Sequence, residues 1–420
     1  KPTCFAMAKA PTDSVFDLAI VGAGPAGGTL ALAAAKLGLS VALIDARDPK
    51  TTPPKDTRNF AIVRGSWNLL AFCGLTEALE TDAEPLRGLE ATDGAPHWFG
   101  APTALFTGDD LGEAAGDGLL GHMVEAENLQ AAIDKAIAKS RTIKVWAPAL
   151  FEGFDLGDGK ITARLEDGST VDARLLAGCD GLKSPVRTAA SIGVEGRRYG
   201  KSVFAADVSL SRPHHGIARQ LFTPEGPFAT LPLRGDRANL AWYMKEGAAE
   251  ALAKRSTEEQ EAELNARFSE FAGEMKIDGP VRAYPLILQV ANSMIADRVA
   301  LVGDAARRIN PLAGQGLNLG FKDVAALAEV AAGQVRAGLD PGSALALETY
   351  QRWRRLDANG TALGMDLIDR VFSNDNMVLK PLRGLALAVA ERTGVIRKAL
   401  AQQASATQGN LPDLMKDPAS

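Results

Sequence analysis

Two hydrophobic patterns follow one another near the start of the chain. The apolar run Phe16 to Val21 predicts a buried strand, and the Ala/Leu-rich stretch Pro25 to Leu37 predicts a helix that ends at Gly38. A second apolar run begins at Ser40 and finishes on Asp45. This order predicts a parallel strand–helix–strand unit.

Similar patterns recur later in the chain. Ala173 to Gly181 and Arg298 to Val302 predict two more buried strands, each leading into a turn that contains glycine and aspartate. From Gln315 to Val335 apolar residues recur at helical spacing, which predicts a helix packed on one face. These apolar residues are Leu317, Phe321, Val324, Ala328 and Ala331.

The remaining stretches predict a second layer of structure. Val203 to Leu210 and Asn239 to Met244 alternate as strands do, and the Glu-rich stretch Leu252 to Phe271 predicts an exposed helix. A long helix is expected from Ser343 to Val371, after the Pro341-Gly342 start signal. We leave Lys1 to Ala6, which precede Met7, out of the fold prediction.

Composition narrows the class of protein. The 420 residues are 46% hydrophobic and 23% charged, as in a folded globular chain long enough for two domains. A net charge of -5 gives no electrostatic footprint for nucleic acid, so that partner is excluded. Three cysteines and four histidines without metal-ligand spacing predict reduced thiols, an intracellular protein and no bound metal. No window holds the roughly 20 uninterrupted apolar residues of a membrane-spanning helix.

The first turn carries a nucleotide-binding fingerprint. Gly22 allows a tight turn, Gly24 lets the backbone approach a pyrophosphate, and Gly27 lets the helix pack on the strand. Asp45 follows about 20 residues later, the usual distance to the acid that binds ribose hydroxyls. A glycine-rich turn without a ligand is the alternative. The residues predicted to bind the nucleotide here are Gly22, Gly24, Pro25, Ala26, Gly27, Asp45, Ala46 and Arg47.

The middle segment, Cys179-Asp180-Gly181, follows a predicted strand. Ser184 and Pro185 after it are typical of a helix N-cap and first turn. Arg187 would stand one turn into that helix, where its guanidinium could reach a phosphate or a carboxylate. Asp-Gly by itself is also a common turn signal, so a structural turn is the alternative.

The third segment joins an acid to a glycine-rich helix start. The strand ending at Leu301-Val302 leads into Gly303-Asp304, a carboxylate suited to the ribityl hydroxyls of a flavin. After Pro311, the sequence Gly314-Gln315-Gly316 would present bare amides and the positive end of the helix dipole to an anion. Reduced flavin is such an anion. A helix merely docked on the sheet would explain the apolar stripe but not these glycines.

These three segments, in this order, resemble the class A flavoprotein aromatic monooxygenases. More narrowly, the run from Gly303-Asp304-Ala305-Ala306 through Pro311 to Gly320 with Asp323 resembles the ubiquinone-biosynthesis hydroxylases, as does the run Tyr350 to Arg355 with Phe372-Ser373-Asn374. The resemblance covers about Asp13 to Ser405. Arg58 matches the early arginine that this family has near the flavin.

The resemblance implies an α/β fold. An FAD-binding Rossmann-like domain of the glutathione-reductase type would be interleaved with an antiparallel-sheet substrate domain and followed by C-terminal helices. We expect residues 13–83, 121–195 and 283–342 in the FAD-binding domain and residues 84–120 and 196–282 in the substrate domain. Residues 343–405 would form the helical region and residues 406–420 a flexible tail.

The resemblance also implies the chemistry. FAD reduced by NAD(P)H or a ferredoxin would react with O2 to form a C4a-hydroperoxide, which hydroxylates a polyprenylated phenol in ubiquinone biosynthesis. The catalytic backbone would be Pro311, Gly314, Gln315 and Gly316. Further FAD contacts would come from Arg58, Asp180, Gly181, Gly303, Asp304, Gly316, Leu317 and Asn318. Hydroxylation of another aromatic metabolite, or a non-catalytic FAD-binding scaffold subunit, remain the alternatives.

Two positions depart from the family pattern. Such hydroxylases commonly carry histidine at the positions of Arg307 and Asn310, so Arg307 adds a fixed charge near the expected flavin edge. The candidate substrate-lining residues are Phe222, Phe228, Leu231, Pro232, Trp242 and Arg307. The apolar members of this set would suit the core of a sheet domain equally well.

The C-terminal region suggests where the protein works. The stretch Leu382 to Ser405 alternates apolar and basic residues, so it could lie on a membrane surface, bind another ubiquinone-biosynthesis protein, or pack on its own domain. We therefore expect a cytoplasmic protein that attaches peripherally to the inner membrane face.

Overall fold

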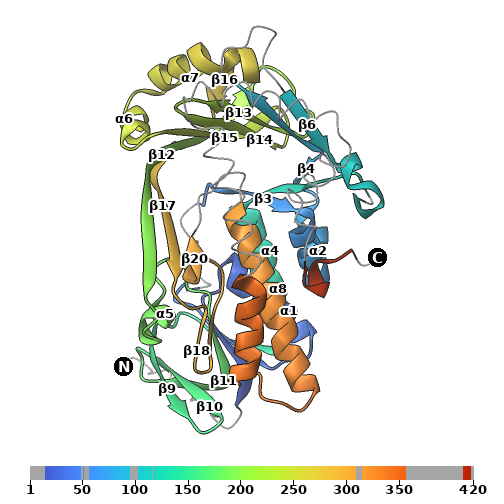
Figure 1. The fold of residues 1–420 in the computed structure, drawn as a ribbon, viewed down its shortest axis with the longest axis vertical. Coiled ribbons are helices and arrows are strands. Elements are labelled where there is room, and N and C mark those ends of the chain that lie inside the picture. The colour runs from blue at the N-terminus through green and yellow to red at the C-terminus, as the bar shows by residue number, and fades with distance from the viewer. Residues whose placement is uncertain are drawn as a thin grey trace, which may run out of the picture.

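Two large sheets and one small sheet organise the chain in the computed structural model (Figure 1). The structure describes residues 15–48, 51, 56–94, 103–115, 117–308, 315–355 and 410–417. The predictions for Asn310, Pro311 and Gly314, for residues 356–371, and for the basic amphipathic stretch 382–405 lie outside the described residues.

The parallel sheet forms as the N-terminal patterns predict. β1 pairs in parallel with β2 and β11, and the parallel pairing continues to β8 on one side and β19 on the other. The strands, in spatial order, are β18 (Ile295–Ala296), β19 (Val299–Leu301), β11 (Thr170–Gly178), β1 (Phe16–Val21), β2 (Val41–Ile44) and β8 (Ile143–Trp146). β9 (Phe151–Gly157) and β10 (Lys160–Leu165) extend β11 as an antiparallel meander.

Helices bury this sheet. α1 (Pro25–Lys36) packs against both α4 (Ala126–Lys139) and α8 (Gln315–Arg336), and side chains of all three join the largest hydrophobic core. The apolar stripe predicted on α8 is buried, with Phe321 and Val324 fully enclosed. A helix over residues 344–355 follows α8, close to the predicted start at Ser343.

The second sheet lies at the other end of the molecule. In spatial order it contains β20 (Arg307–Arg308), β17 (Arg282–Ala291), β12 (Val194–Leu210), β15 (Arg237–Lys245), β14 (Gly226–Leu233), β13 (Ile217–Thr223), β5 (Gly88–Asp93) and β6 (Thr103–Thr107), with β16 (Met275–Ile277) beside β12. The prediction of an antiparallel sheet is wrong for one pair, because β5 and β13 are parallel. The sheet also runs past the boundary predicted at residue 282, since β17 pairs with β12.

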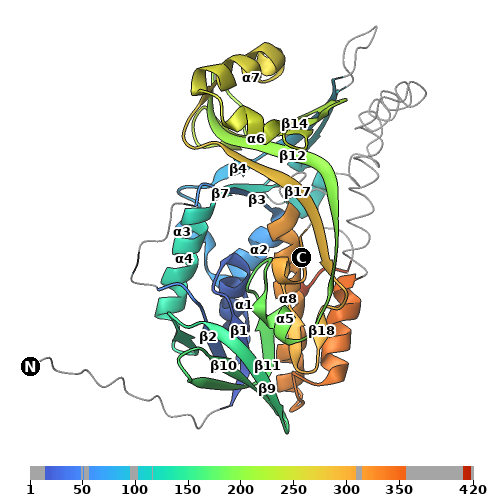
Figure 2. The same ribbon diagram turned by 90° about the vertical axis from the view of Figure 1, so that its left-hand side faces the viewer.

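α6 (Ala248–Ala253) and α7 (Thr257–Ala272) cover the outer face of the second sheet, as both views show (Figures 1 and 2). The single exposed helix predicted from Leu252 to Phe271 is therefore wrong. Ser256 breaks it, because its side chain accepts a hydrogen bond from the Glu259 amide in a capping box that starts α7. Phe268 of α7 is also buried against the sheet.

The small sheet lies beneath the inner face of the second sheet (Figure 2). Its strands are β3 (Asn59–Val63), β7 (Gly121–Glu125) and β4 (Glu84–Leu86). The side-chain amide of Asn59 in β3 donates to Asp207 of β12 at 2.8 Å, and Ala61 and Met123 pack with Leu233 of β14. The connecting elements are α2 (Arg64–Cys73), α3 (Thr76–Leu79), η1 (Gly108–Ala115), α5 (Pro185–Ala189), η2 (Gly303–Ala305) and η4 (Asp413–Met415).

The predicted flexible tail, residues 406–420, is wrong for its described part. Residues 410–417 pack on the protein, with Met415 1% exposed. The Leu414 amide donates to Glu329 of α8 at 2.7 Å, and the indole of Trp353 donates to the Asn410 carbonyl oxygen at 2.6 Å. Apolar burial and these hydrogen bonds outweigh the cost of ordering the polar segment.

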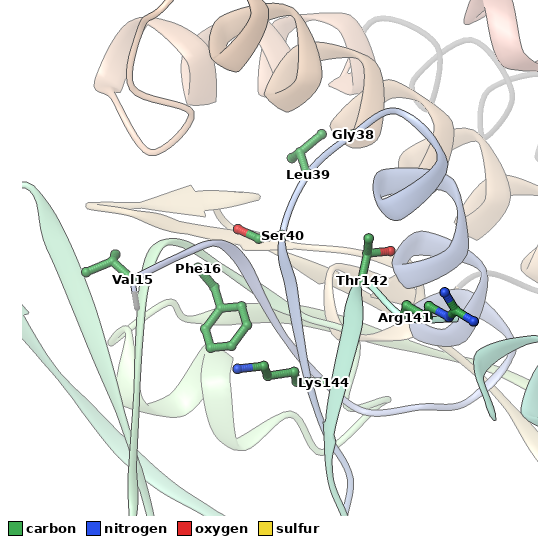
Figure 3. A pocket seen from close by; sticks show the side chains of 8 residues that line it. All are labelled: Val15, Phe16, Gly38, Leu39, Ser40, Arg141, Thr142 and Lys144. Atoms are coloured by element: carbon green, nitrogen blue, oxygen red, sulfur yellow. The ribbon is translucent and has the colours of Figure 1, made fainter. Parts of the chain in front are cut away.

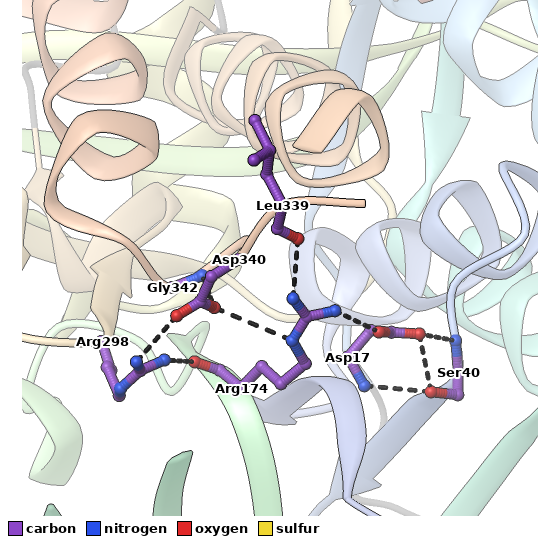
Figure 4. Close-up of polar contacts among 7 residues, drawn as sticks. All are labelled: Asp17, Ser40, Arg174, Arg298, Leu339, Asp340 and Gly342. Carbon is purple, nitrogen blue, oxygen red and sulfur yellow. Dashed lines mark hydrogen bonds and ion pairs between the residues drawn. The ribbon is translucent and has the colours of Figure 1, made fainter. Parts of the chain in front are cut away.

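The amino ends of the parallel strands carry an ion-pair network (Figure 4). Asp17 accepts hydrogen bonds from the backbone and hydroxyl of Ser40, and Arg174 bridges it to the Leu339 carbonyl oxygen. Arg298 donates to Asp340 at 2.7 Å. Near the same end a pocket of about 320 Å³ is lined by Val15, Phe16, Gly38, Leu39, Ser40, Arg141, Thr142 and Lys144 (Figure 3).

Candidate functional site

The three glycine-centred segments meet at the carboxyl ends of the parallel strands. A Cβ on Gly22 would stand 2.5 Å from the Cys179 carbonyl oxygen, so the first turn touches the Asp180 segment. A Cβ on Gly303 would stand 3.5 Å from the Cβ of Ala26 and 3.8 Å from the Cα of Gly320. Residues far apart in the sequence thus surround one place, where open parallel sheets bind ligands.

The first turn has the backbone that its glycines predict. Gly22 adopts a φ of +100°, and a Cβ on Gly27 would stand 1.8 Å from the Gly22 carbonyl oxygen. At Gly24, by contrast, no described atom beyond the residue itself and its two chain neighbours lies within 4 Å of the Cβ position. Gly24 caps α1 without a side-chain hydrogen bond, and the first turn of α1 has no acidic residue. The helix start therefore offers open backbone to an anion.

Hydrogen bonds from the backbone hold the Asp45 side chain against the glycine turn. Its carboxylate accepts hydrogen bonds from the Ala23 amide at 2.5 Å and the Arg47 amide at 2.8 Å. Each carboxylate oxygen can accept a further hydrogen bond, so a ribose hydroxyl remains compatible with this geometry. The guanidinium of Arg47 donates to Asp134 of α4 at 2.9 Å, so its positive charge is paired within the protein.

Sequence reasoning missed Gln130. Its side-chain amide donates to the Ala23 carbonyl oxygen at 2.9 Å and to Asp134 at 2.8 Å, which ties the glycine turn to α4. The helical spacing of Leu129, Ile133 and Ile137 was the available signal for α4, but the sequence does not say which turn such a helix faces.

Asp180 is the least satisfied acid of the site. One carboxylate oxygen accepts from the Val186 amide at 2.9 Å, while Oδ1 is buried without a hydrogen-bond partner among the described residues. Burial raises the pKa of this carboxyl above its ordinary value, against the opposing effects of its hydrogen bonds and of Arg187. An orphaned polar atom of this kind marks a place where a bound group completes the hydrogen bonding.

The prediction for Arg187 is wrong. Ser184 caps α5 as expected, but the guanidinium donates to the carbonyl oxygens of Ala305 and Leu182, both at 2.8 Å. Arg187 is 8% exposed, so it connects the second segment to the third rather than reaching for a phosphate or carboxylate.

Asp304 stands out from its surroundings. It is exposed, whereas its neighbours from Val299 to Arg307 are buried. Partial enclosure by protein raises the pKa of its carboxyl, an effect that the positive charges of Arg308 and Arg58 oppose. Arg58 lies within electrostatic range of Asp304 and pairs with Asp56 at 2.6 Å, and its contact with the flavin stays a prediction.

The start of α8 is described in part. Apart from its chain neighbours and the backbone of α8, no described atom lies within 4 Å of the Cβ position of Gly316, so this side of the helix start is open to a ligand. Leu317 is half-buried against the main core. The side-chain amide of Asn318 bonds β3, donating to the Ala61 carbonyl oxygen at 2.7 Å and accepting from the Val63 amide at 3.1 Å. A cofactor contact by Asn318 stays a prediction. The side chain of Gln315 lies outside the described residues.

These residues fit an FAD molecule. The open backbone at Gly24 suits a pyrophosphate, Asp45 an adenosine ribose, and Asp304 a ribityl chain. Gly181, with a φ of +80° and no described atom within 4 Å of its Cβ position, leaves room beside the orphaned oxygen of Asp180. Each contact to FAD remains a prediction of this fit.

The substrate-lining predictions divide between the two faces of the second sheet. Phe228 and Trp242 pack against Phe268 of α7 on the outer face, with Trp242 1% exposed. Pro232 pairs with Ala238, which joins the same outer core. Phe228 and Trp242 belong to the core under α7, and Pro232 lies on the same face of β14, so the prediction that these three residues line the inner face is wrong.

Leu231 and Phe222 face the other way. Leu231 packs with Ala61 and Met123 of the small sheet. Phe222 neighbours Leu221, which joins the outer core, so strand alternation directs Phe222 to the inner face. Both residues remain candidates for a substrate contact.

Tyrosines on the inner face were missed. Tyr243 and Tyr284 form an inner-face cluster with Val203, Ala205 and Leu286. Burial raises the pKa of Tyr284, while Arg282, Arg308 and Arg58 lower it, so Tyr284 lies in the same electrostatic neighbourhood as Asp304. Alternation along β15 predicts that Tyr243 and Trp242 lie on opposite faces of the sheet. It does not say which of the two faces is the one toward the flavin site.

Arg307 does not face a substrate. Its side chain is 6% exposed and pairs with Asp323 of α8, which is fully buried. It also contacts the Met294 sulfur at 3.3 Å. The expectation of a fixed charge at the substrate pocket is therefore wrong, because a partner carboxylate in the core holds the guanidinium.

Comparison with known proteins gives the same picture. Residues 16–361 match the model of the FAD binding domain. The chain is 37% identical to ubiquinone hydroxylase UbiL of Rhodospirillum rubrum, over 94% of this chain and 90% of that protein. It is 33% identical to the 3-demethoxyubiquinol 3-hydroxylase of Escherichia coli, over 92% of this chain and 97% of that protein. The chain belongs to the FAD binding domain family.

Solved structures of other proteins share the fold. The p-nitrophenol 4-monooxygenase PnpA of Pseudomonas putida superposes with a TM-score of 0.76 at 19% identity, covering 94% of this chain and 99% of that one. An HpxO variant of Klebsiella pneumoniae, solved in complex with FAD, gives a TM-score of 0.72 at 18% identity, covering 93% and 99%. The chain is thus a flavoprotein hydroxylase with FAD as its cofactor.

Proposed function

We propose that this flavoprotein hydroxylates the aromatic ring of a polyprenylated phenol on the route to ubiquinone, using O2 and a reduced donor such as NAD(P)H or a ferredoxin. One observation carries the proposal: Gly24, Asp180 and Asp304 come together at one end of the parallel sheet, in a chain whose ubiquinone-hydroxylase relatives match over nine-tenths of its length. The overall reaction puts one oxygen atom on the ring and releases the other as water.

Bound FAD would supply the activation of O2. The residues of this chain would bind and orient the cofactor and the substrate. The open backbone at Gly24 and the carboxylate of Asp304 would hold the two ends of the cofactor, and the N-terminus of α8 at Gly316 would favour negative charge beside it.

The inner face of the second sheet is the proposed substrate side. Leu231, Phe222, Tyr243 and Tyr284 bring apolar and phenolic surface to this face, which suits an electron-rich ring with a hydrocarbon tail. Such a face would also keep water from the reacting atoms.

We also propose attachment to a membrane or to other ubiquinone-biosynthesis proteins, because the hydrocarbon tail of the substrate would keep it in a membrane. Among the described residues no helix is long and apolar enough to span a bilayer. We propose that the protein binds at the membrane surface and reaches a membrane-dissolved phenol from there.

The test is a turnover assay on the purified, FAD-loaded protein. Candidate prenylphenols, NADPH or NADH, and isotopically labelled O2 are supplied, and the product is analysed by mass spectrometry. We expect one labelled oxygen atom on the ring. Labelling of a different aromatic compound alone would favour the hydroxylase of another metabolite, and FAD binding without transfer to any phenol would favour the scaffold role.

A further inference from the structure

Asp323 connects both ends of the turn that carries Asp304. Its Oδ2 accepts a hydrogen bond from the Gly303 amide at 3.1 Å, on one side of Asp304. Its Oδ1 accepts one from the guanidinium of Arg307, on the other side. A single carboxylate on α8 therefore spans the five residues of this turn.

Backbone contacts also hold the turn: the Ala291 amide donates to the Ala306 carbonyl oxygen at 2.8 Å, and Arg307 of β20 pairs with Val290 of β17. Gly303 adopts a φ of +63° and lies between Ala26 of α1 and Gly320 of α8, where its Cβ position is 3.5 Å from the one and 3.8 Å from the other. Arg187 adds one hydrogen bond, to the Ala305 carbonyl oxygen. Within this buried run Asp304 is the exposed side chain, so the geometry of the turn sets where its carboxylate stands.

The Asp323 carboxylate is itself compensated in the core. It is 0% exposed, and Arg354 of the helix over residues 344–355 donates to its Oδ1 at 2.7 Å. Burying a carboxylate is unfavourable unless charges and hydrogen bonds offset its loss of water. Arg307 and Arg354 provide that offset from two different elements.

We infer that Asp323 is a positioning residue for the flavin: clamped between Arg307 and Arg354, it fixes the Gly303–Arg307 turn and so places the carboxylate of Asp304. The inference rests on the FAD site of the proposed function but not on the substrate. It also gives Arg307, which departs from the family pattern, a role that acts through Asp323.

A binding measurement on the apoprotein tests this without any turnover. FAD is titrated into wild type, Asp323→Asn, Arg307→Met and Asp304→Asn, and the dissociation constant is read from quenching of flavin fluorescence. An asparagine in place of Asp323 presents an amide to two guanidinium groups, so we expect the turn to shift. Asp323→Asn should weaken FAD binding by about tenfold or more, and Arg307→Met by a smaller factor in the same direction.

The double variant Asp323→Asn/Asp304→Asn separates positioning from general loosening. If Asp323 acts by placing Asp304, then Asp323→Asn should weaken FAD binding by less than about twofold when Asp304 is already replaced. Two effects that simply multiply would overturn the inference, and so would an Asp323→Asn protein that binds FAD as tightly as wild type.

Arg298→Met is the matched control. It breaks another arginine–aspartate pair, with Asp340, that lies at the opposite end of the same strands (Figure 4). This variant should lose thermal stability but keep the FAD dissociation constant within about twofold. A comparable loss of FAD binding in the control would overturn the inference. If Asp323→Asn does not fold, the same comparison is made with Arg307→Met and the double variant Arg307→Met/Asp304→Asn. Because FAD binding is measured without turnover, failure to find a prenylphenol substrate would count against the proposed function but not against this inference.

Discussion

The two ends of the parallel sheet use charge in opposite ways. At the amino ends Asp340 pairs with Arg298, and the pKa of its carboxyl lies below the ordinary value, since the hydrogen bonds and nearby arginines outweigh its partial burial. At the carboxyl ends the pKa of both carboxyls is raised, for Asp180 by burial and for Asp304 by partial enclosure by the surrounding protein. One end satisfies its acids within the protein, whereas the other keeps them partly unsatisfied. Perturbed pKa values of this kind are typical of a binding site.

The largest expected effect is on stability, from Asp323→Ala. Removing this carboxylate leaves two buried guanidinium groups without their shared partner, which should cost about 3–5 kcal/mol of the free energy of unfolding. Asp340→Ala breaks a more exposed pair and should cost about 1 kcal/mol or less. Urea unfolding of both variants measures the difference. Equal losses would contradict the contrast between the two ends.

Gly24→Ala should separate binding from folding. Its φ of -67° suits alanine and its Cβ position is open, so the free energy of unfolding should stay the same or rise by up to about 1 kcal/mol. The added methyl group should nevertheless weaken FAD binding by about tenfold, because it occupies the approach to the backbone.

Gly27→Ala is the control for this prediction. Its Cβ would collide with the Gly22 carbonyl oxygen, so this variant should lose both stability and FAD. Tight FAD binding by Gly24→Ala would show that the pyrophosphate lies elsewhere.

Neutralising one acid at each end should change stability in opposite directions at pH 7. The raised pKa of Asp304 means that the folded state holds its proton more firmly than the unfolded state, so ionisation costs stability above that pKa. The lowered pKa of Asp340 contributes stability above the ordinary carboxyl pKa of about 3.9, which is lost as the pH falls through the folded-state pKa.

Thermal unfolding of the apoprotein at pH 7 measures this. Asp304→Asn should unfold at a slightly higher temperature than wild type while binding FAD more weakly, and Asp340→Asn should unfold at a lower temperature with FAD binding unchanged. Destabilisation by both variants would show that Asp304 is satisfied within the protein.

The smallest effect is expected at the pocket near the amino ends. The ammonium group of Lys144 lies 5.6 Å from the centre of the Phe16 ring, an exposed cation–π contact worth about 0.5–1 kcal/mol (Figure 3). Lys144→Met should therefore change the free energy of unfolding by no more than this and leave FAD binding as it is. Calorimetry with FAD titration checks both, and weakened FAD binding would mean that the two ends are coupled.

Sequence patterns predicted the elements of the FAD site well for a physical reason. Helical and strand periodicities are local, and the glycine turn between β1 and α1 needs its glycines because Gly22 and Gly27 have no room for a side chain. The same local rules placed Ser184 at the N-cap of α5. They failed for the helix expected from Leu252 to Phe271, where the capping box at Ser256 went unrecognised.

Side-chain destinations were the harder part. Arg187 was expected to reach a phosphate or a carboxylate and donates to two carbonyl oxygens instead, and Trp242 was expected at a substrate and packs under α7. Arg307 was expected at the substrate pocket and pairs with Asp323. In each case the residue type was informative, but its partner comes from an element distant in the sequence.

The sequence by itself determined the family, the cofactor and the order of the FAD-binding segments, because a close approach of backbone to a nucleotide requires particular residues at fixed local spacing. The tertiary structure alone decided which face of the second sheet meets the flavin side, and how one buried carboxylate, Asp323, reaches around the turn that carries Asp304. These outcomes depend on contacts between distant elements, and packing and charge compensation in the core select them.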